Sequence, residues 1–131
     1  MDRLFLDANI LFSAAYRADA GLRRLWRLPA AKLITSTYAA LEARRNLNKG
    51  QCGDLDTLLI EVEVIDLVPP AHFMKALPDL PEKDRPILFA AVSAKATHLI
   101  TGDITHFGVF FGKKLKGVLI VSPADYLTKR R

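Results

Sequence analysis

THLITGDITHF, residues 97–107, is a short apolar run that stops at a glycine and then presents Asp103. This pattern predicts a buried strand that ends in a carboxylate. RLFLDAN, residues 3–9, repeats the design, with Asp7 at its end and a helix-forming stretch after Asn9. Two strands that each deliver an acid at the carboxyl end favour an open parallel sheet, with a site where the strand order reverses.

Length and composition indicate one globular domain. The chain has 131 residues, of which half are hydrophobic and a quarter are charged, and this size suffices for one sizeable core. We therefore expect a single domain over residues 1–131. Cys52 is the only cysteine, which excludes an internal disulfide and a metal site built on thiolates.

The hydropathy pattern favours a cytoplasmic protein. The chain begins without a basic segment that leads into an apolar one, as a secretory signal would. No apolar run approaches the roughly 18 residues that a membrane-spanning helix needs. The single cysteine also fits a reducing compartment.

The net charge of +5 is unevenly distributed along the chain. Residues 1–49 carry nine Lys/Arg against four Asp/Glu, residues 50–103 carry four against nine, and residues 104–131 carry six against one. If the outer segments fold onto the rim of one crevice, basic surface flanks an acidic pocket, which suits a polyanion held over bound metal. The alternative is an ordinary solvated basic surface.

The order of predicted elements is that of a wound sheet. Alternating apolar patterns and caps predict strands at 3–7, 32–35, 62–68, 97–103 and 118–121, and helices after Asn9, at 22–28, 37–49, 54–60 and 84–94, and after Ser122. Gly50–Gly53 is expected to be a break, and at most one helical turn is expected near Phe73–Leu77. This alternation predicts a three-layer α/β sandwich.

Several of the polar and aromatic residues have a structural interpretation when each is taken alone. Glu42 can pair with Arg45 or Arg44, and Asp84 can cap the helix whose first turn contains Pro86. Trp26 fits a core or oligomer contact as well as an RNA surface. His106, alone in a loop, fits a solvent-facing position.

Read together, the acids predict a metal site. Asp7 and Asp103, at the ends of adjacent strands, are the natural inner ligands, and Asp84 and Glu42 can reach the same crevice from two sides. Mg²⁺ and Mn²⁺ prefer carboxylate oxygens and complete their shell with water or substrate phosphate. Four carboxylates this close would repel one another unless cations lay among them.

These residues resemble a known family, the PIN domain. The resemblance is carried by FLDANIL, by Glu42 within TYAALEARR, by KDRPILFAA around Asp84, by LITGDITHF, and by VLIVSPADYL near the C-terminus. It covers nearly the whole chain, and it rests on the order and spacing of the motifs together. It implies a three-layer α/β/α sandwich with a parallel sheet of about five strands, and an endoribonuclease that uses Mg²⁺ or Mn²⁺.

The resemblance also implies site residues and partners. Asp7, Glu42, Asp84 and Asp103 match the family's acidic positions, which bind metal and catalyse. Asn9 and Thr101 match polar positions that orient the ligands. Many small members are the toxin half of a toxin-antitoxin pair (VapC-like) and form dimers, so an antitoxin protein and a homodimer are expected. Two features depart from the commonest pattern: Glu82-Lys83-Asp84 replaces a run of aspartates, and the basic segment after Asp103 is longer.

The predicted reaction is metal-assisted hydrolysis of an RNA phosphodiester, in which the ion lowers the pKa of a water that attacks phosphorus. His106 and Arg85 are candidate substrate contacts. Two alternatives stay open at this point. One is a PIN-like module that binds RNA or a protein without cutting. The other is a phosphotransfer domain that forms an aspartyl-phosphate on Asp7, although a second acid beside Asp7 is missing.

Overall fold

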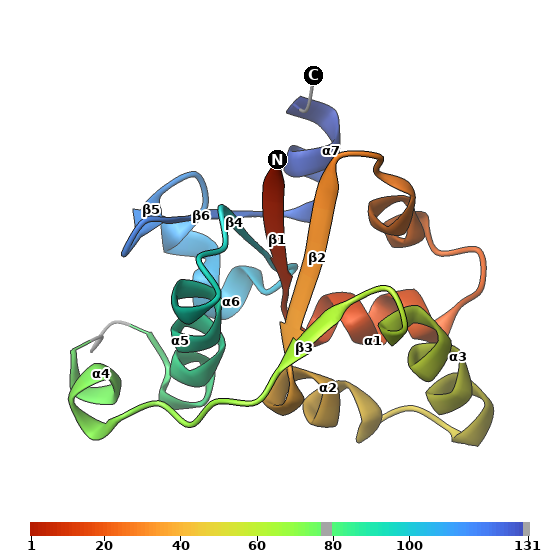
Figure 1. The fold of residues 1–131 in the computed structure, drawn as a ribbon, viewed down its shortest axis with the longest axis horizontal. Helices are drawn as coiled ribbons and strands as arrows, with labels where there is room; N and C mark the ends of the chain where they lie inside the picture. The colour runs from red at the N-terminus through yellow and green to blue at the C-terminus, as the bar shows by residue number, and fades with distance from the viewer. Residues whose placement is uncertain (77–79, 130–131) are drawn as a thin grey trace.

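The computed structural model describes residues 1–76 and 80–129. Strands and helices alternate along the chain (Figure 1). The strands are β1 (Asp2–Leu6), β2 (Ala31–Ser36), β3 (Glu63–Ile65), β4 (His98–Ile100), β5 (Lys114–Leu115) and β6 (Val118–Val121). The α-helices are α1 (Ala8–Tyr16), α2 (Thr37–Arg44), α3 (Lys49–Leu59), α4 (Ala71–Lys75), α5 (Arg85–Ser93), α6 (Ile104–Phe107) and α7 (Pro123–Lys129). Three 3₁₀ helices are η1 (Gly21–Arg27), η2 (Glu82–Asp84) and η3 (Gly108–Phe110).

The strands form one sheet in the order β3-β2-β1-β4-β6-β5. All neighbouring pairs are parallel except β5 and β6, which are antiparallel. The sheet therefore has six strands where about five were expected, and the additional strand is the two-residue β5. The strand order reverses between β1 and β4, where Leu6 lies opposite Ile100. This reversal confirms the topological switch point that the sequence predicts.

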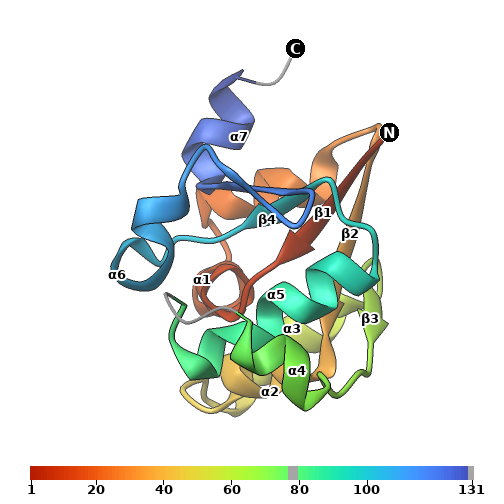
Figure 2. The ribbon, with the colours of Figure 1, turned by 90° about the vertical axis from the view of Figure 1, so that its left-hand side faces the viewer.

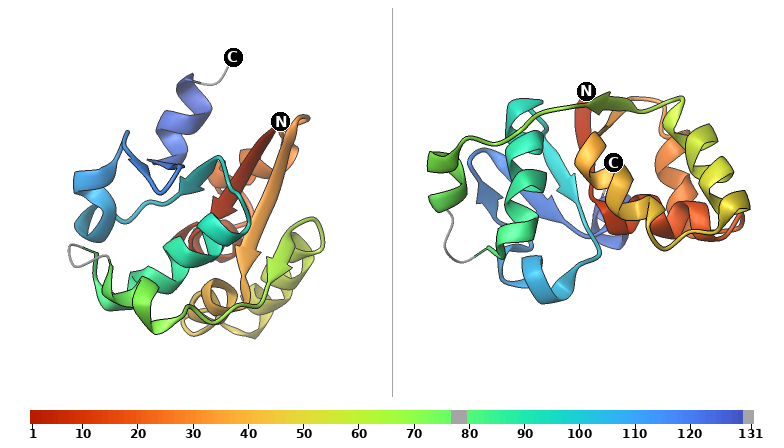
Figure 3. Two further views of the ribbon diagram at one scale, coloured as in Figure 1. Left: turned by 60° about the vertical axis from the view of Figure 1, so that its left-hand side comes forward. Right: turned by 90° about the horizontal axis from the view of Figure 1, so that it is seen from below.

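Helices cover both sides of the sheet, so the three-layer α/β/α sandwich is confirmed. α4 and α5 lie on one side, and α1 and α3 lie on the other (Figures 2 and 3). α2 follows directly from the carboxyl end of β2 and lies below the strand ends in Figure 1. The carboxyl ends of β1, β2 and β4 are thus close to the starts of α1, α2 and α6.

The central strands are apolar because they are covered on both faces. Leu4, Phe5 and Leu6 of β1 are fully buried, as are Leu99 and Ile100 of β4. A strand buried on both faces loses the alternation of apolar and polar residues and becomes a continuous apolar run. The same rule explains why short apolar runs in the sequence predict the central strands β1 and β4.

Trp26 packs against the core, which agrees with the core contact and not with the RNA surface offered for it from the sequence. Its ring packs against the core from η1, and its indole Nε1 donates a hydrogen bond of 2.9 Å to the Leu58 carbonyl of α3. The predicted basic helix at 22–28 is present, but as a 3₁₀ helix.

The predicted break at Gly50–Gly53 is wrong, because these glycines lie inside α3. The helix begins earlier than Asp54 because Asn48 caps it. The Asn48 side chain accepts a hydrogen bond of 2.8 Å from Gln51 N, and the Gln51 side chain accepts one of 2.9 Å from Asn48 N. This reciprocal pair satisfies two otherwise orphaned donors and offsets the cost of two glycines.

Further boundaries differ from prediction. The helix predicted at 37–49 ends at Arg44, and the strand predicted at 97–103 is limited to His98–Ile100. α1 begins at Ala8, before Asn9, and Asp7 caps it through a hydrogen bond from Ala8 N. The third strand is limited to Glu63–Ile65. The expected turn near Phe73–Leu77 is α4, which ends at Lys75, and Leu77 lies outside the described residues. Ser36 caps α2 and Ser122 accepts a hydrogen bond from Asp125 N, as predicted.

The two edges of the sheet are short. At one edge β3 has three residues, and Glu63 of β3 pairs with Lys32 at 3.1 Å. At the other edge β5 has two residues and includes Lys114, with Lys113 beside it. Within residues 1–76 and 80–129, none of the helices has the length and apolar character that crossing a membrane requires.

The capping pair of α3 gives a stability prediction. Asn48→Ala should lower the free energy of unfolding by about 1 kcal/mol, because the Gln51 N–H loses its partner. Urea denaturation of the wild type and variant measures the change. Asn46→Ala is the matched control, since Asn46 is exposed two residues earlier, and it should change the value by less than about 0.5 kcal/mol. Equal effects of the two substitutions would contradict the capping role.

Candidate functional site

All four predicted acids line one cavity at the carboxyl end of the sheet. Its volume is about 150 Å³, and the acids come from four different parts of the chain. The lining residues are Asp7, Ala8, Asn9, Tyr38, Glu42, Lys83, Asp84, Ile87 and Asp103. The structure thus brings together the four acids that we expected, from the sequence, to reach one crevice.

Asp7 is held rigidly at the end of β1. Its Oδ1 accepts a hydrogen bond of 2.7 Å from Ala8 N at the start of α1. Its Oδ2 accepts one of 2.8 Å from the Thr101 hydroxyl and one of 3.1 Å from Asn9 Nδ2. Both carboxylate oxygens are therefore occupied by donors, and the residue is only 4% exposed.

Asn9 and Thr101 join the ends of β1 and β4. The Thr101 hydroxyl accepts hydrogen bonds from Asn9 Nδ2 at 3.2 Å and from Asp103 N at 3.1 Å. The Asn9 side-chain oxygen accepts one of 2.8 Å from Gly102 N. Because the side chains of Asn9 and Thr101 each donate and accept, the network fixes the Asp7 carboxylate relative to the backbone of Gly102 and Asp103.

Burial dominates the electrostatics of Asp7. It raises the pKa of the carboxyl from 3.8 to about 6, against the opposing effect of the hydrogen bonds from Thr101 and Ala8. The negative charges of Asp84 and Asp103 raise the pKa further. A buried carboxylate beside other acids is costly to ionise, so the site favours a nearby positive charge.

Asp84 occupies the N-cap position of α5 but does not act as a cap. Among the described residues its side chain makes no capping hydrogen bond, so the capping interpretation is wrong. Its Oδ2 instead lies 2.8 Å from Nδ1 of His106. Burial raises the pKa of the Asp84 carboxyl, and the charge of Asp103 adds to this effect while His106 and Lys83 oppose it.

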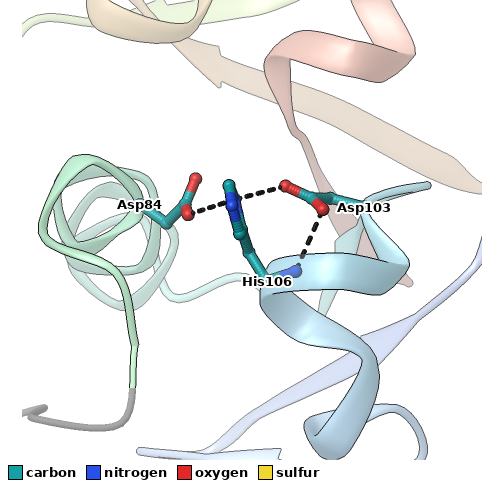
Figure 4. Close-up of side chains that lie close together, drawn as sticks. All are labelled: Asp84, Asp103 and His106. Atoms are coloured by element: carbon teal, nitrogen blue, oxygen red, sulfur yellow. Dashed lines mark hydrogen bonds and ion pairs between the residues drawn. The ribbon is translucent and has the colours of Figure 1, made fainter.

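His106 lies between two carboxylates, so the solvent-facing interpretation of this residue is wrong. Its Nδ1 lies 2.8 Å from Asp84 Oδ2 and also 2.8 Å from Asp103 Oδ2, and Figure 4 shows the two acids on either side of the ring. Its backbone N–H donates a hydrogen bond of 3.0 Å to Asp103 Oδ1, which caps α6.

The three side chains have an unmet bonding requirement. Nδ1 carries at most one proton, which lies in the ring plane and cannot point at an acid on each side. Accordingly, Asp84 Oδ2 and His106 Nδ1 are buried without a hydrogen bond of good geometry to any described residue. One ligand atom each from Asp84, Asp103 and His106 lies within 4.8 Å of the others, an arrangement that could hold a metal ion.

Glu42 lies at the edge of the cavity and pairs with Arg45 at 2.9 Å, which confirms that structural interpretation of Glu42. One helical turn earlier, the Tyr38 hydroxyl donates a hydrogen bond of 2.6 Å to the Lys83 carbonyl. This bond connects α2 to the segment that carries Asp84. Burial raises the pKa of Tyr38, and the charges of Glu42 and Asp84 add to the shift.

Arg85 binds carbonyls of its own neighbourhood. Its Nε donates a hydrogen bond of 2.8 Å to the Leu80 carbonyl, and its Nη1 donates one of 2.5 Å to the Met74 carbonyl. It is not among the described residues that line the cavity. These bonds fix the start of α5, and a contact between Arg85 and a substrate stays a prediction.

Sequence reasoning did not single out Tyr38 and Lys83 as residues of the cavity. Tyr38 precedes Glu42 by four positions in the same helix, a spacing that puts both side chains on one face. Lys83 is adjacent to Asp84. For His106 the available signal was its position three residues after Asp103, which one helical turn converts into proximity.

The chain was compared with known proteins. No protein-family model and no curated protein matches it. Its fold is similar to that of a chain in the solved structure of VapBC2 from Rickettsia felis bound to a DNA fragment from their promoter, with a TM-score of 0.69. The match has 16% sequence identity and covers 92% of this chain and 98% of that chain. At this identity the similarity shows the fold alone.

The raised pKa of Asp7 makes the stability of the metal-free protein depend on pH. The carboxyl ionises near pH 6 in the folded state and near pH 3.8 ordinarily, so the folded state binds more protons between these values. In chelator, the free energy of unfolding should contain a contribution of about 3 kcal/mol that is present below pH 3.8 and is lost as the pH rises through 6.

Urea denaturation between pH 4 and about pH 7, with Asp7→Asn as the reference, measures this contribution. The variant has no ionisable group at this position, so the wild type should lose stability relative to the variant as the pH rises. The same pH dependence in both proteins would show that Asp7 titrates normally.

Proposed function

We propose that this protein is a PIN-like endoribonuclease that hydrolyses RNA with Mg²⁺ or Mn²⁺. One observation carries the proposal: four carboxylates from four parts of the chain line one small cavity, and at its buried side Asp84 Oδ2 has no well-aligned donor within the described residues. Asp7 and Asp84 are buried, and acids grouped in this way are stable as anions only with positive charge among them. A divalent cation meets that requirement, and it fits the oxygen donors present.

The residues proposed to bind the ion are Asp7, Glu42, Asp84 and Asp103. When bound, the ion would supply Lewis acidity and a water molecule of lowered pKa. Asp84 and Asp103 offer oxygens directed at one point, whereas Asp7 lies deeper and is already bonded to three donors. Glu42 lies at the rim beside Arg45, where it can orient a water.

The remaining residues of the site position these acids and meet the substrate. Thr101 and Asn9 hold the Asp7 carboxylate next to the Asp103 backbone through the Thr101 hydroxyl, which the other three residues share. Lys83 lines the cavity, where its charge favours a phosphate. The sequence suggests His106 and Arg85 as substrate contacts. His106 is the better supported of the two, because it lies beside two of the acids of the site.

The geometry of Asp7 argues against a phosphotransfer domain. An aspartyl-phosphate forms only when a carboxylate oxygen can attack phosphorus in line. Oδ1 of Asp7 accepts the Ala8 N–H, and Oδ2 accepts Thr101 and Asn9. With both oxygens bonded and the residue 4% exposed, Asp7 is suited to holding a charge and not to attack as a nucleophile.

We further propose that the protein is a cytoplasmic toxin of a toxin-antitoxin pair, that it forms a homodimer and that an antitoxin protein binds it. The sequence resemblance and the fold similarity to a chain of a VapBC2 complex support this role. A neighbouring reading frame that encodes a small DNA-binding protein would support it further, whereas its absence would favour a general ribonuclease.

Asp103→Asn should abolish RNA cleavage without altering the fold. Asparagine caps helices as well as aspartate does, so α6 keeps its hydrogen bond from His106 N. Purified protein is incubated with a mixed structured RNA and Mn²⁺ or Mg²⁺, with chelator as the negative control. Wild-type cleavage should require the ion, and the variant should cut no faster than the chelated protein.

Asp54→Asn is the matched control, since it removes an exposed acid from α3 and should leave cleavage unchanged. Circular dichroism verifies that both variants are folded. If the wild type binds RNA in a salt-dependent manner but cuts none of it, the binding-module alternative replaces the nuclease. If Asp103→Asn cuts as fast as the wild type, the acidic cluster is not the catalytic centre.

Thr101→Val tests the network that holds the acids. The substitution keeps the shape of this fully buried side chain but removes the hydroxyl that donates to Asp7 Oδ2 and accepts from Asp103 N. Asn9 Nδ2 loses one of its two acceptors and keeps Asp7 Oδ2. Cleavage should fall by about 10- to 100-fold, and the free energy of unfolding should fall by about 1–3 kcal/mol. Thr101→Ser keeps the hydroxyl and should retain most of the activity. A serine variant as impaired as the valine variant would mean that packing of the methyl group, and not hydrogen bonding, matters here.

A further inference from the structure

The ligand atoms gathered at the cavity include a nitrogen, and this affects which ion the site selects. Nδ1 of His106 lies 2.8 Å from an oxygen of Asp84 and 2.8 Å from one of Asp103. Cis ligands of a six-coordinate ion bound at about 2.1 Å are about 3 Å apart, by simple geometry. The two distances from Nδ1 are therefore close to those between neighbouring ligands of one ion, and all three ligand atoms lie within 4.8 Å of one another.

The imidazole is held at this position by the backbone. Asp103 and His106 are the N-cap and third residue of α6, and the His106 N–H donates to Asp103 Oδ1. On the other side, Asp84 is only 7% exposed and points its unpartnered Oδ2 at the ring (Figure 4). Three contacts from two separate segments thus hold Nδ1 among the acids, where an ordinary surface histidine would face water.

Hydrogen bonding alone does not explain this arrangement. A neutral or protonated imidazole has at most one proton on Nδ1, and that proton lies in the ring plane. The acids lie on either side of the ring (Figure 4), and the described residues provide no well-aligned acceptor for Nδ1. A lone pair on Nδ1 that is directed to a cation would satisfy both carboxylates and the ring together.

We infer that His106 is a direct ligand of the ion, together with Asp84 and Asp103, and that this mixed nitrogen and oxygen site selects a transition-metal dication such as Mn²⁺ over Mg²⁺. Imidazole suits transition-metal ions, whereas Mg²⁺ prefers oxygen ligands and keeps its waters. The inference rests on the proposed function only in requiring that an ion binds here.

Electron spin echo spectroscopy of the Mn²⁺-loaded wild-type protein tests the inference without any activity measurement. Directly bound ¹⁴N should modulate the Mn²⁺ echo, and protein labelled with ¹⁵N-histidine should show the changed frequencies. The chain has three histidines. His106→Gln should remove the modulation, and His72→Gln, at an exposed position of α4, should keep it. His106→Gln retains the backbone N–H that donates to the Asp103 cap of α6, and circular dichroism verifies its fold.

Metal competition provides a second measurement. Titration of wild-type protein with Mn²⁺, followed by displacement with Mg²⁺, should give at least about tenfold tighter binding of Mn²⁺. His106→Gln should weaken Mn²⁺ binding by at least about tenfold and change Mg²⁺ binding by much less, while His72→Gln should match the wild type.

Two results would overturn the inference. One is Mn²⁺ bound to the wild type without nitrogen modulation, and the other is a His106→Gln variant that keeps the wild-type preference for Mn²⁺. Either result would leave the ribonuclease proposal intact if the wild type still cuts RNA and Asp103→Asn does not. Failure of that cleavage test, with nitrogen modulation present, would instead leave a metal site of another function.

Discussion

The parallel pairing of β1 with β4 is the constraint on which the site depends. It places Leu6 opposite Ile100, so that the next residues along both strands, Asp7 and Thr101, meet at one edge of the sheet. Their hydrogen bond of 2.8 Å then joins two segments separated by 94 positions in the sequence. Because side chains alternate along a strand, a slip of one residue in this register would direct Thr101 to the opposite face and separate it from Asp7.

Burial of the acids and their proximity to one another lower the stability of the folded protein. Asp7 and Asp84 are buried and lie near Asp103, so their pKa values are raised. The fold compensates with apolar strands that are covered on both faces and with donors aimed at Asp7. Because the rigid fold keeps the carboxylates close together, they repel one another. A bound cation relieves this repulsion and is therefore held strongly.

The sequence predicted the layers, the strand-end acids and their common crevice, because each depends on local patterns of apolar and polar residues. It did not predict the start of α3, where the Asn48 capping pair outweighs two glycines. The sequence placed Asp84 among the metal-binding acids and His106 among the substrate contacts, but it did not predict that the two side chains meet, because either residue alone also fits a cap or a loop. Their proximity depends on how the starts of α5 and α6 approach each other at the carboxyl end of the sheet, which no local pattern encodes. Sequence patterns also did not predict the bonds of Arg85 to the Leu80 and Met74 carbonyls, because these bonds depend on the path of the preceding segment.

The short edges of the sheet have a consequence for the behaviour of the protein at high concentration. An exposed edge strand offers unpaired backbone groups to other chains, and long flat edges promote aggregation. β3 and β5 offer only three and two residues, and Glu63 and Lys114 place charges there. Strand addition between copies would therefore form few backbone hydrogen bonds and would crowd charged side chains. The chain can keep a strongly apolar central sheet and still resist amyloid-like stacking.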